Sequence, residues 1–108
     1  METNAYINCL RSKKHDIVDV SMRQALCYYL YKQNIPCVLI AKLIGCTRRN
    51  VYMRVYRTID LLETGDKYIK AALAEIDNHK INIKPCTVDG DLLSRHTGYK
   101  MIIDNIIL

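Results

Sequence analysis

Arg48, Arg49 and Asn50 are consecutive residues whose side chains are suited to reading DNA bases. An Arg guanidinium can donate two hydrogen bonds to O6 and N7 of guanine, which contributes about 1–3 kcal/mol of discrimination. An Asn amide can pair with adenine in a similar way, although Asn50 can also face the protein. Tyr52 and Met53 follow, and either can contact a thymine methyl group. The spacing therefore predicts contact with base edges in a DNA groove.

Other basic residues are better suited to DNA phosphates, because phosphate contacts give affinity without sequence information. Lys13, Lys14, Lys42 and Arg57 are the candidates for this role. If about six phosphates are neutralised, the logarithm of the binding constant should fall with the logarithm of salt concentration at a slope of about −5. Together, the candidate DNA-binding residues are Arg11, Lys13, Lys14, Lys42, Thr47, Arg48, Arg49, Asn50, Tyr52, Met53 and Arg57.

Positive charge is concentrated in the part of the chain that contains these residues. The 108 residues have a net charge of +5. Residues 11–57 contain ten Lys and Arg against two Asp, a net charge of +8, whereas residues 58–108 contain six against eight acids, a net charge of −2. Glu2 supplies the remaining −1. This asymmetry favours attraction of residues 11–57 to a polyanion. The alternative is that these residues form a solvated basic surface without a binding role.

A helix, a tight turn and a second helix are expected within residues 37–57, where they would position the candidate side chains. Gly45 would form the turn, since Gly accepts a positive φ. Ala41 is small enough to let the two helices touch, and Val51 would anchor the second helix. The Thr47 hydroxyl can accept from a free N–H of the second helix and cap it. This is the frame of a helix-turn-helix, whose second helix enters the DNA major groove.

Apolar residues at helical spacing predict two helices before this motif. The first is short and covers residues 4–11. A basic loop at residues 11–14 follows, and it could lie along a phosphate backbone. The second helix covers residues 20–32, and either Asp19 or Ser21 can cap its start.

Cap and turn signals set the remaining helix ends. Asn34 can cap the short first helix of the motif, with Pro36 in its first turn, where the missing N–H costs nothing. Gly65 can end the second helix, and Asp66 can cap a last helix. The expected helices are therefore 4–11, 20–32, 35–44, 48–63 and 67–80.

Residues 81–108 differ from the helical part. Isoleucines alternate with polar residues at the start, Pro85 opposes a helix, and Asp89-Gly90 is a turn signal. Thr97-Gly98 separates this part from an Ile-rich end. A strand or short hairpin is the first interpretation of that end, and an amphipathic helix is the second. Either leaves apolar surface to pack on the helices or on a second copy of the chain.

Patterns typical of enzymes, metal sites and membrane segments are missing from the sequence. There is no nucleophile–base pair and no carboxylate pair with a plausible cleft, and no GxxxxGK[ST] loop, so we expect no enzyme, cofactor or bound nucleotide. Five Cys without a CxxC pair and three scattered His make a zinc site unexpected. No apolar run approaches the roughly 20 residues of a membrane helix, and the start has no signal-peptide pattern. We expect a cytoplasmic, nucleoid-associated protein with reduced thiols.

A series of short motifs between residues 6 and 80 occurs in a familiar order. They are Tyr6–Leu10, Arg11-Ser12-Lys13-Lys14, Met22-Arg23-Gln24-Ala25, Tyr29-Leu30, Ile35-Pro36, Ile40, Gly45, Leu61-Leu62 and Ile69. In order and spacing they resemble the C-terminal DNA-binding domain of the bacterial replication initiator DnaA, in the Trp-repressor-like helix-turn-helix group. The resemblance implies a mainly α bundle of four to five helices in which a basic loop and a recognition helix grip double-stranded DNA together.

The start of the recognition helix departs from that family. The family has Arg-Asp-His-Thr-Thr-Val, whereas residues 46–51 are Cys-Thr-Arg-Arg-Asn-Val, so only Val51 agrees. The resemblance therefore implies the scaffold and leaves the DNA target open. We expect a DNA-binding domain at residues 1–80, acting in replication or transcription control. Residues 81–108 would be an extension for packing or homodimer formation. The alternative is a protein-interaction adaptor that has lost DNA binding and works through the Ile-rich end.

Overall fold

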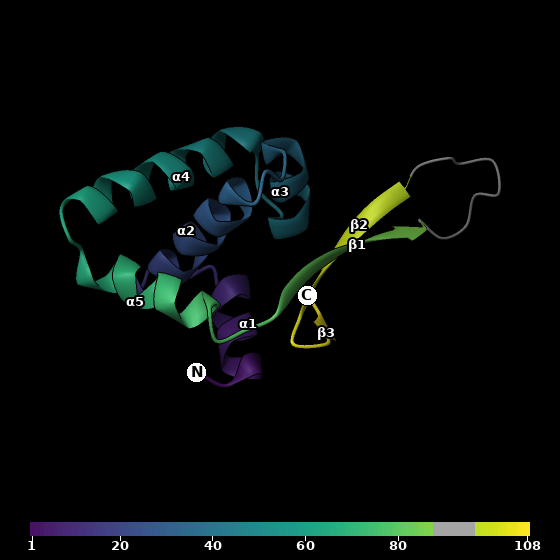
Figure 1. Ribbon diagram of the computed structural model, residues 1–108, viewed down its shortest axis with the longest axis horizontal. Coiled ribbons are helices and arrows are strands. Elements are labelled where there is room, and N and C mark those ends of the chain that lie inside the picture. The colour runs from purple at the N-terminus through teal and green to yellow at the C-terminus, as the bar shows by residue number, and fades with distance from the viewer. Residues whose placement is uncertain (88–96) are drawn as a thin grey trace.

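The computed structural model describes residues 1–87 and 97–108, which form a helical body with a small antiparallel sheet at one side (Figure 1). The expected mainly α fold is confirmed. The described helices are α1 (Thr3–Arg11), α2 (Ile17–Lys32), α3 (Cys37–Ile44), α4 (Arg48–Glu63) and α5 (Lys67–Ile76), and the strands are β1 (Ile81–Thr87), β2 (Thr97–Ile103) and β3 (Ile106–Ile107).

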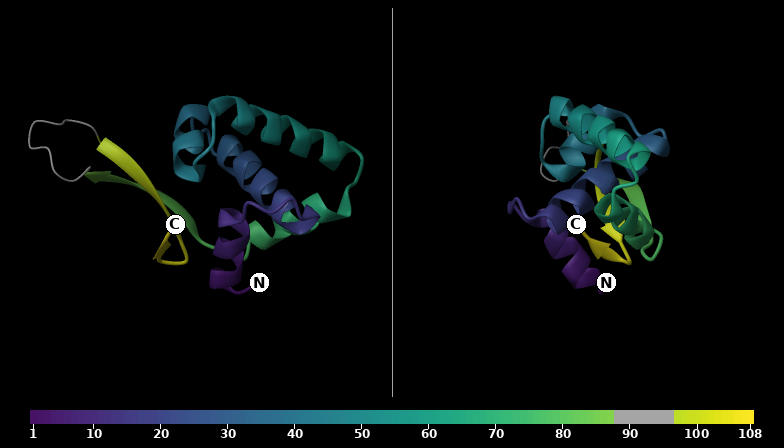
Figure 2. Two further views of the ribbon diagram at one scale, coloured as in Figure 1. Left: turned by 180° about the vertical axis from the view of Figure 1, so that it is seen from behind. Right: turned by 90° about the vertical axis from the view of Figure 1, so that its left-hand side faces the viewer.

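Helix α2 is the centre of the helical body, and it packs against α1, α3, α4 and α5 (Figures 1 and 2). Its Ala25, Leu26 and Leu30 are almost fully buried. Met101 and Ile103 of β2 are buried in the same core, so the sheet and the helices share one hydrophobic interior. Burial of one Leu, Ile or Met side chain contributes about 1.5–3 kcal/mol to the free energy of folding. The inward residues of α4 and α5 also lie in or against this core, and they are Val51, Val55, Ile59, Leu62, Ile69, Ala72, Leu73 and Ile76.

The start of α2 lies three residues before the expected position. Asp16 caps the helix, because its carboxylate accepts a hydrogen bond of 2.9 Å from the Val18 N–H. The expectation of a cap at Asp19 or Ser21 was wrong, since both lie inside the helix. Ile17 and Val18 are 53% and 40% exposed, so the first turn of α2 carries no buried apolar pattern that could have indicated it.

Asn34 follows the end of α2 and does not cap α3, so the expectation that Asn34 caps α3 was wrong. Its φ of +64° is left-handed. The N–H of Ile35 donates to the Leu30 carbonyl at 3.2 Å, and the N–H of Asn34 donates to the Tyr31 carbonyl at 3.1 Å. These two bonds satisfy carbonyls that the helix end would leave free. Helix α3 therefore begins at residue 37, two residues later than expected, and Pro36 precedes the helix at the cap position.

The expected ends of α4 agree with the structure. Gly45 turns the chain after α3 with a φ of +81°, and the Thr47 hydroxyl accepts from the Asn50 N–H at 3.2 Å. Gly65, with a φ of +74°, follows the other end of the helix. The Asp66 carboxylate then accepts from the first turn of α5, as expected. Helix α5 ends at Ile76, four residues before the expected end.

The strand interpretation of the C-terminal extension is confirmed, and the alternative of a terminal amphipathic helix is wrong. Strands β1 and β2 pair antiparallel, with Ile81 opposite Ile103 and Ile83 opposite Met101. Thr97 and Gly98 belong to β2 instead of separating it from the preceding segment, and the Asp89-Gly90 turn signal lies outside the described residues. The far halves of β1 and β2 extend beyond the helices on the side of α3 (Figures 1 and 2).

A two-residue turn at Asp104-Asn105 connects β2 to β3. Both residues have a positive φ, +49° and +71°. This conformation matches the right-handed twist of a hairpin, and Asp and Asn tolerate it better than most residues. The turn brings Ile106 opposite Ile103 and Ile107 opposite Ile102.

Candidate nucleic-acid interface

The structure places every candidate DNA-binding residue on the surface. All eleven side chains are exposed, including the three at the start of α4. Arg11 is the last residue of α1, so the basic loop consists of residues 12–16 and begins one residue later than expected. Hereafter "basic loop" means residues 12–16.

The outer face of α4 presents Arg49, Met53 and Arg57 at successive helical turns. Met53 is 59% exposed. The opposite face is fixed to α2 by burial of Val51 and by the Thr58 hydroxyl, which lies 2.8 Å from the Arg54 carbonyl and 3.2 Å from the Gln24 carbonyl. Thr58 is fully buried, a position that the apolar pattern did not reveal because its side chain is polar.

Tyr52 lies on the flank of α4 that faces the start of α3. It borders a hollow together with Tyr31, Pro36 and Cys37. A hydrogen bond between the Tyr52 hydroxyl and the Cys37 thiol raises the pKa of Tyr52. Tyr52 also stacks with Tyr56 at a centroid distance of 6.4 Å. The structure thus directs Met53 outward, while Tyr52 leans toward α3.

Arg23 of α2 holds the basic loop in place. Its guanidinium donates to the carbonyl of Ser12 and, at 2.8 Å, to the carbonyl of Lys14. The Ser12 hydroxyl also accepts from the Lys14 N–H at 3.1 Å. The side chains of Lys13 and Lys14 remain exposed. The sequence indicated Arg23 only as part of the Met22–Ala25 motif and did not predict its contact with the basic loop. No local pattern indicates a hydrogen bond that spans eleven residues.

Asp19 is the acidic group next to the basic loop. Hydrogen bonds from Cys9 and Ser12, together with the nearby charges of Arg23 and Lys14, lower its pKa. The carboxylate therefore stays ionised and offsets part of the positive charge at the base of the loop.

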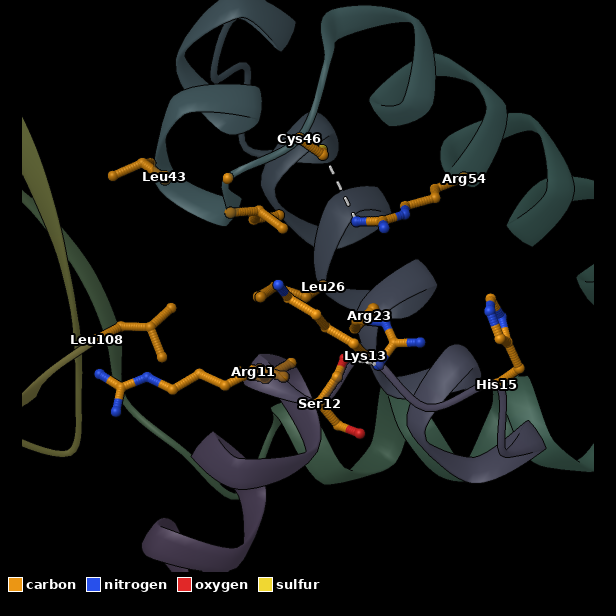
Figure 3. A pocket seen from close by; sticks show the side chains of 13 residues that line it. Arg11, Ser12, Lys13, His15, Arg23, Leu26, Leu43, Cys46, Arg54 and Leu108 are labelled. Atoms are coloured by element: carbon orange, nitrogen blue, oxygen red, sulfur yellow. Dashed lines mark hydrogen bonds between the residues drawn. The ribbon is translucent and has the colours of Figure 1, made fainter.

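A pocket of about 430 Å³ lies between the basic loop and the turn that joins α3 to α4 (Figure 3). Lys13 lines it from the loop, Cys46 from the turn, and Arg23 and Arg54 from α2 and α4. Arg11 borders it as well, whereas the remaining nine candidate residues do not. The pocket shows that the loop and the turn face each other across one hollow, so both belong to one side of the molecule.

The basic side chains lack acidic partners within the part of the chain that the structure describes. None of the Lys and Arg residues in 1–87 and 97–108 forms an ion pair there; the ion pairs present involve only His79 and the amino group of Met1. The positive charge of the basic loop and α4 is therefore available to an external anion.

Comparison with protein-family models, curated proteins and solved structures gave no match. In residues 1–87 and 97–108, no group of three or more His, Cys, Asp and Glu side chains is arranged to hold a metal ion. None of the helices described above has the length and apolar character needed to cross a membrane.

Proposed function

We propose that this protein binds double-stranded DNA through a helix-turn-helix formed by α3 and α4, on a bundle of the Trp-repressor-like or DnaA-domain type. Helix α4 is the recognition helix, and Arg48, Arg49 and Asn50 at its start meet base edges. The basic loop, Lys42 and Arg57 contact phosphates. The proposed setting is replication or transcription control at the nucleoid.

The observation that carries this proposal is the absence of ion-pair partners for the exposed cations of the described residues. The exposed Lys and Arg side chains of the basic loop and α4 form no ion pair within the described residues, and the loop faces the turn that precedes α4 across one pocket. Such a surface attracts a polyanion and is sensitive to salt. The exposed start of α4 supports the direct reading of bases, since the first turns of a recognition helix lie deepest in the groove.

The first experiment is fluorescence anisotropy with a random-sequence duplex at salt concentrations from about 50 to 200 mM. We expect binding that weakens with salt at a slope near −5, which corresponds to about six phosphate contacts. Absence of binding at about 50 mM salt would contradict the proposal. Selection from a random duplex pool would then identify the sequence preference, and a two-fold-symmetric product would indicate a dimer.

The second experiment removes the two arginines at the start of α4. The double substitution Arg48→Ala and Arg49→Ala should weaken binding about tenfold or more, because each Arg loses a bidentate base contact or a phosphate contact. The matched control is Lys67→Ala with Lys70→Ala, which removes the same charge from α5. Equal losses in both variants would show that only net charge matters and would remove Arg48 and Arg49 from the site.

A protein-interaction adaptor is the second candidate function, and exposed apolar residues favour it. Tyr56 on α4 is 62% exposed, and Ile106 and Ile107 on β3 are 40% and 55% exposed. Apolar side chains at the surface favour a partner that covers them. A second copy of the chain bound at β3 would be one such partner, and analytical ultracentrifugation of the wild type against Ile107→Lys tests it. Concentration-dependent dimers that the substitution abolishes would support that interface, and a monomeric wild type would exclude it.

A further inference from the structure

Four basic residues border the pocket between the basic loop and the turn that joins α3 to α4. Lys13 and Arg54 point into it from opposite sides, and Arg23 lies beside the basic loop near the base of Lys13 (Figure 3). Arg11 lies at its edge. None of the side chains that line the pocket is an Asp or a Glu. The pocket is thus lined by basic side chains with no acidic side chain among them, and Asp19 lies outside it at the base of the loop.

Among these residues, Arg54 is the one whose guanidinium most needs a hydrogen-bond acceptor. It lies on the flank of α4, it is half-buried, and its guanidinium contacts the Cys46 thiol at 3.8 Å. A thiol is a weak acceptor, and five N–H donors cannot be satisfied by it. The nearby Cys27 thiol does not supply a negative charge either, because burial raises its pKa to about 11. A partly desolvated guanidinium is stabilised best by an anion that can accept two hydrogen bonds.

Arg23 has a different task in the same pocket. Two of its N–H groups already donate to the carbonyls of Ser12 and Lys14, so it holds the loop and adds positive charge. This places Lys13 opposite Arg54. The walls include Leu26 and other apolar side chains, which lower the local dielectric and strengthen any charge–charge interaction inside.

We propose that this pocket binds a phosphate group, with Arg54 and Lys13 as its ligands and Arg23 as a positioning residue. A volume of about 430 Å³ exceeds that of an isolated phosphate, so the group would be part of a larger molecule. The phosphate belongs either to the DNA backbone or to a free phosphorylated small molecule. The first source rests on the proposed DNA binding, whereas the second does not.

The test compares the wild type with Arg54→Gln, and Lys70→Gln is the control that removes one charge on α5. In the first arm, pyrophosphate is titrated at constant ionic strength while the unfolding midpoint and the amide NMR shifts are measured. A site for a free phosphorylated molecule predicts a rise in the unfolding midpoint of about 5 °C at tenfold excess over Kd in the wild type and the control, and the rise should grow with the logarithm of the concentration. It also predicts shifts at residues 12–15 and 45–46, and the loss of both effects in Arg54→Gln.

In the second arm, binding to duplex DNA is measured as a function of salt. A site for a backbone phosphate predicts that Arg54→Gln lowers the salt slope by about 1, and the slope should fall less in the control. If Arg54→Gln does not fold, Lys13→Gln on the exposed loop replaces it. The proposal is overturned if neither arm separates the variant from the wild type. A wild type that binds pyrophosphate but not DNA would reject the proposed function and keep the pocket.

Discussion

His79 ties the sheet to the helices through two carboxylates. Its Nε2 lies 3.0 Å from Glu75 of α5, and its Nδ1 lies 2.5 Å from Asp104 in the turn between β2 and β3. The imidazole stacks on the Tyr6 ring at a centroid distance of 4.4 Å, and only 3% of the side chain is exposed. Both nitrogens can donate only when the ring is protonated. The charged form of His79 is therefore the form that links α5 to the turn.

The pKa of His79 decides the pH range in which this link exists. Burial alone lowers that pKa, but hydrogen bonds to Asp104 and Glu75 outweigh burial and raise it above its ordinary value. Hydrogen bonds from His79, from the Lys80 N–H and from Thr3 lower the pKa of Asp104 to about 2, so this partner stays charged. A raised folded-state pKa means that the stabilisation is fully present below about pH 6.5 and is lost as pH rises through the raised value. Each unit of elevation corresponds to about 1.4 kcal/mol.

The substitution His79→Gln measures this contribution. The stack with Tyr6 is worth about 0.5–1.5 kcal/mol. Hydrogen bonds to charged groups are worth about 1.5–3 kcal/mol, and the lower end applies because the Glu75 and Asp104 side chains are 14% and 27% exposed. We expect a loss of about 2 kcal/mol in unfolding free energy near pH 6, shrinking toward the contribution of the stack near pH 9.

Urea unfolding followed by far-UV circular dichroism between about pH 5.5 and 9 is the assay. The control is His15→Gln, the same substitution at an exposed His, and its stability should follow the wild type at every pH. A constant difference between the wild type and His79→Gln across this range would refute the reasoning, since it would mean that the pKa of His79 is the same in the folded and the unfolded protein.

Four further substitutions test single contacts. Tyr6→Phe removes a buried hydroxyl without a partner in the described residues, so urea unfolding should show unchanged stability or a gain of up to about 1 kcal/mol; a clear loss would reveal a missed partner. Lys100→Glu places an acid opposite Lys84 and should add about 0.2–1 kcal/mol by the same assay, whereas destabilisation would question the register. Gly65→Ala should lower stability by about 1 kcal/mol, because a φ of +74° is unfavourable for Ala and the new Cβ would make only an ordinary contact with Lys70 Nζ at 3.7 Å; a neutral result would argue against that conformation. Arg23→Lys keeps the charge but cannot span two carbonyls, so hydrogen exchange in the basic loop should accelerate, and unchanged protection would exclude its positioning role.

The helix ends that could be predicted are those where the signal is local. Helix α4 has the expected bounds, because the Thr47 hydroxyl and the positive φ of Gly65 act within a few residues of its ends. The start of α2 could not be predicted in the same way. Asp16 is a good cap, but Ile17 and Val18 are exposed, so the apolar periodicity begins only one turn later.

The interactions that could not be predicted join residues that are far apart in sequence. The Thr3 hydroxyl donates to Asp104 at 2.7 Å across 101 residues, and His79 joins the same carboxylate across 25. The early end of α5 also depends on a contact between residues that are far apart in sequence. The chain leaves the helix after Ile76 through a bond from the His79 N–H to the Ile76 carbonyl, which takes the imidazole to the turn between β2 and β3. No local pattern indicates that a histidine will leave a helix for a partner on a sheet.

Two neighbouring residues of α2 hold the two halves of the proposed DNA surface. The Gln24 carbonyl contacts the buried Thr58 of α4, and the Arg23 guanidinium holds the basic loop. The distance between the loop and α4 is therefore set by the buried central helix and not by the exposed side chains themselves. Residues at the start of α4 can therefore change without altering the contacts that position the loop and the helix. Changes at Arg48 and Arg49 alter what the surface contacts, whereas changes at Arg23 or Thr58 alter whether the two halves lie where one DNA duplex could meet both.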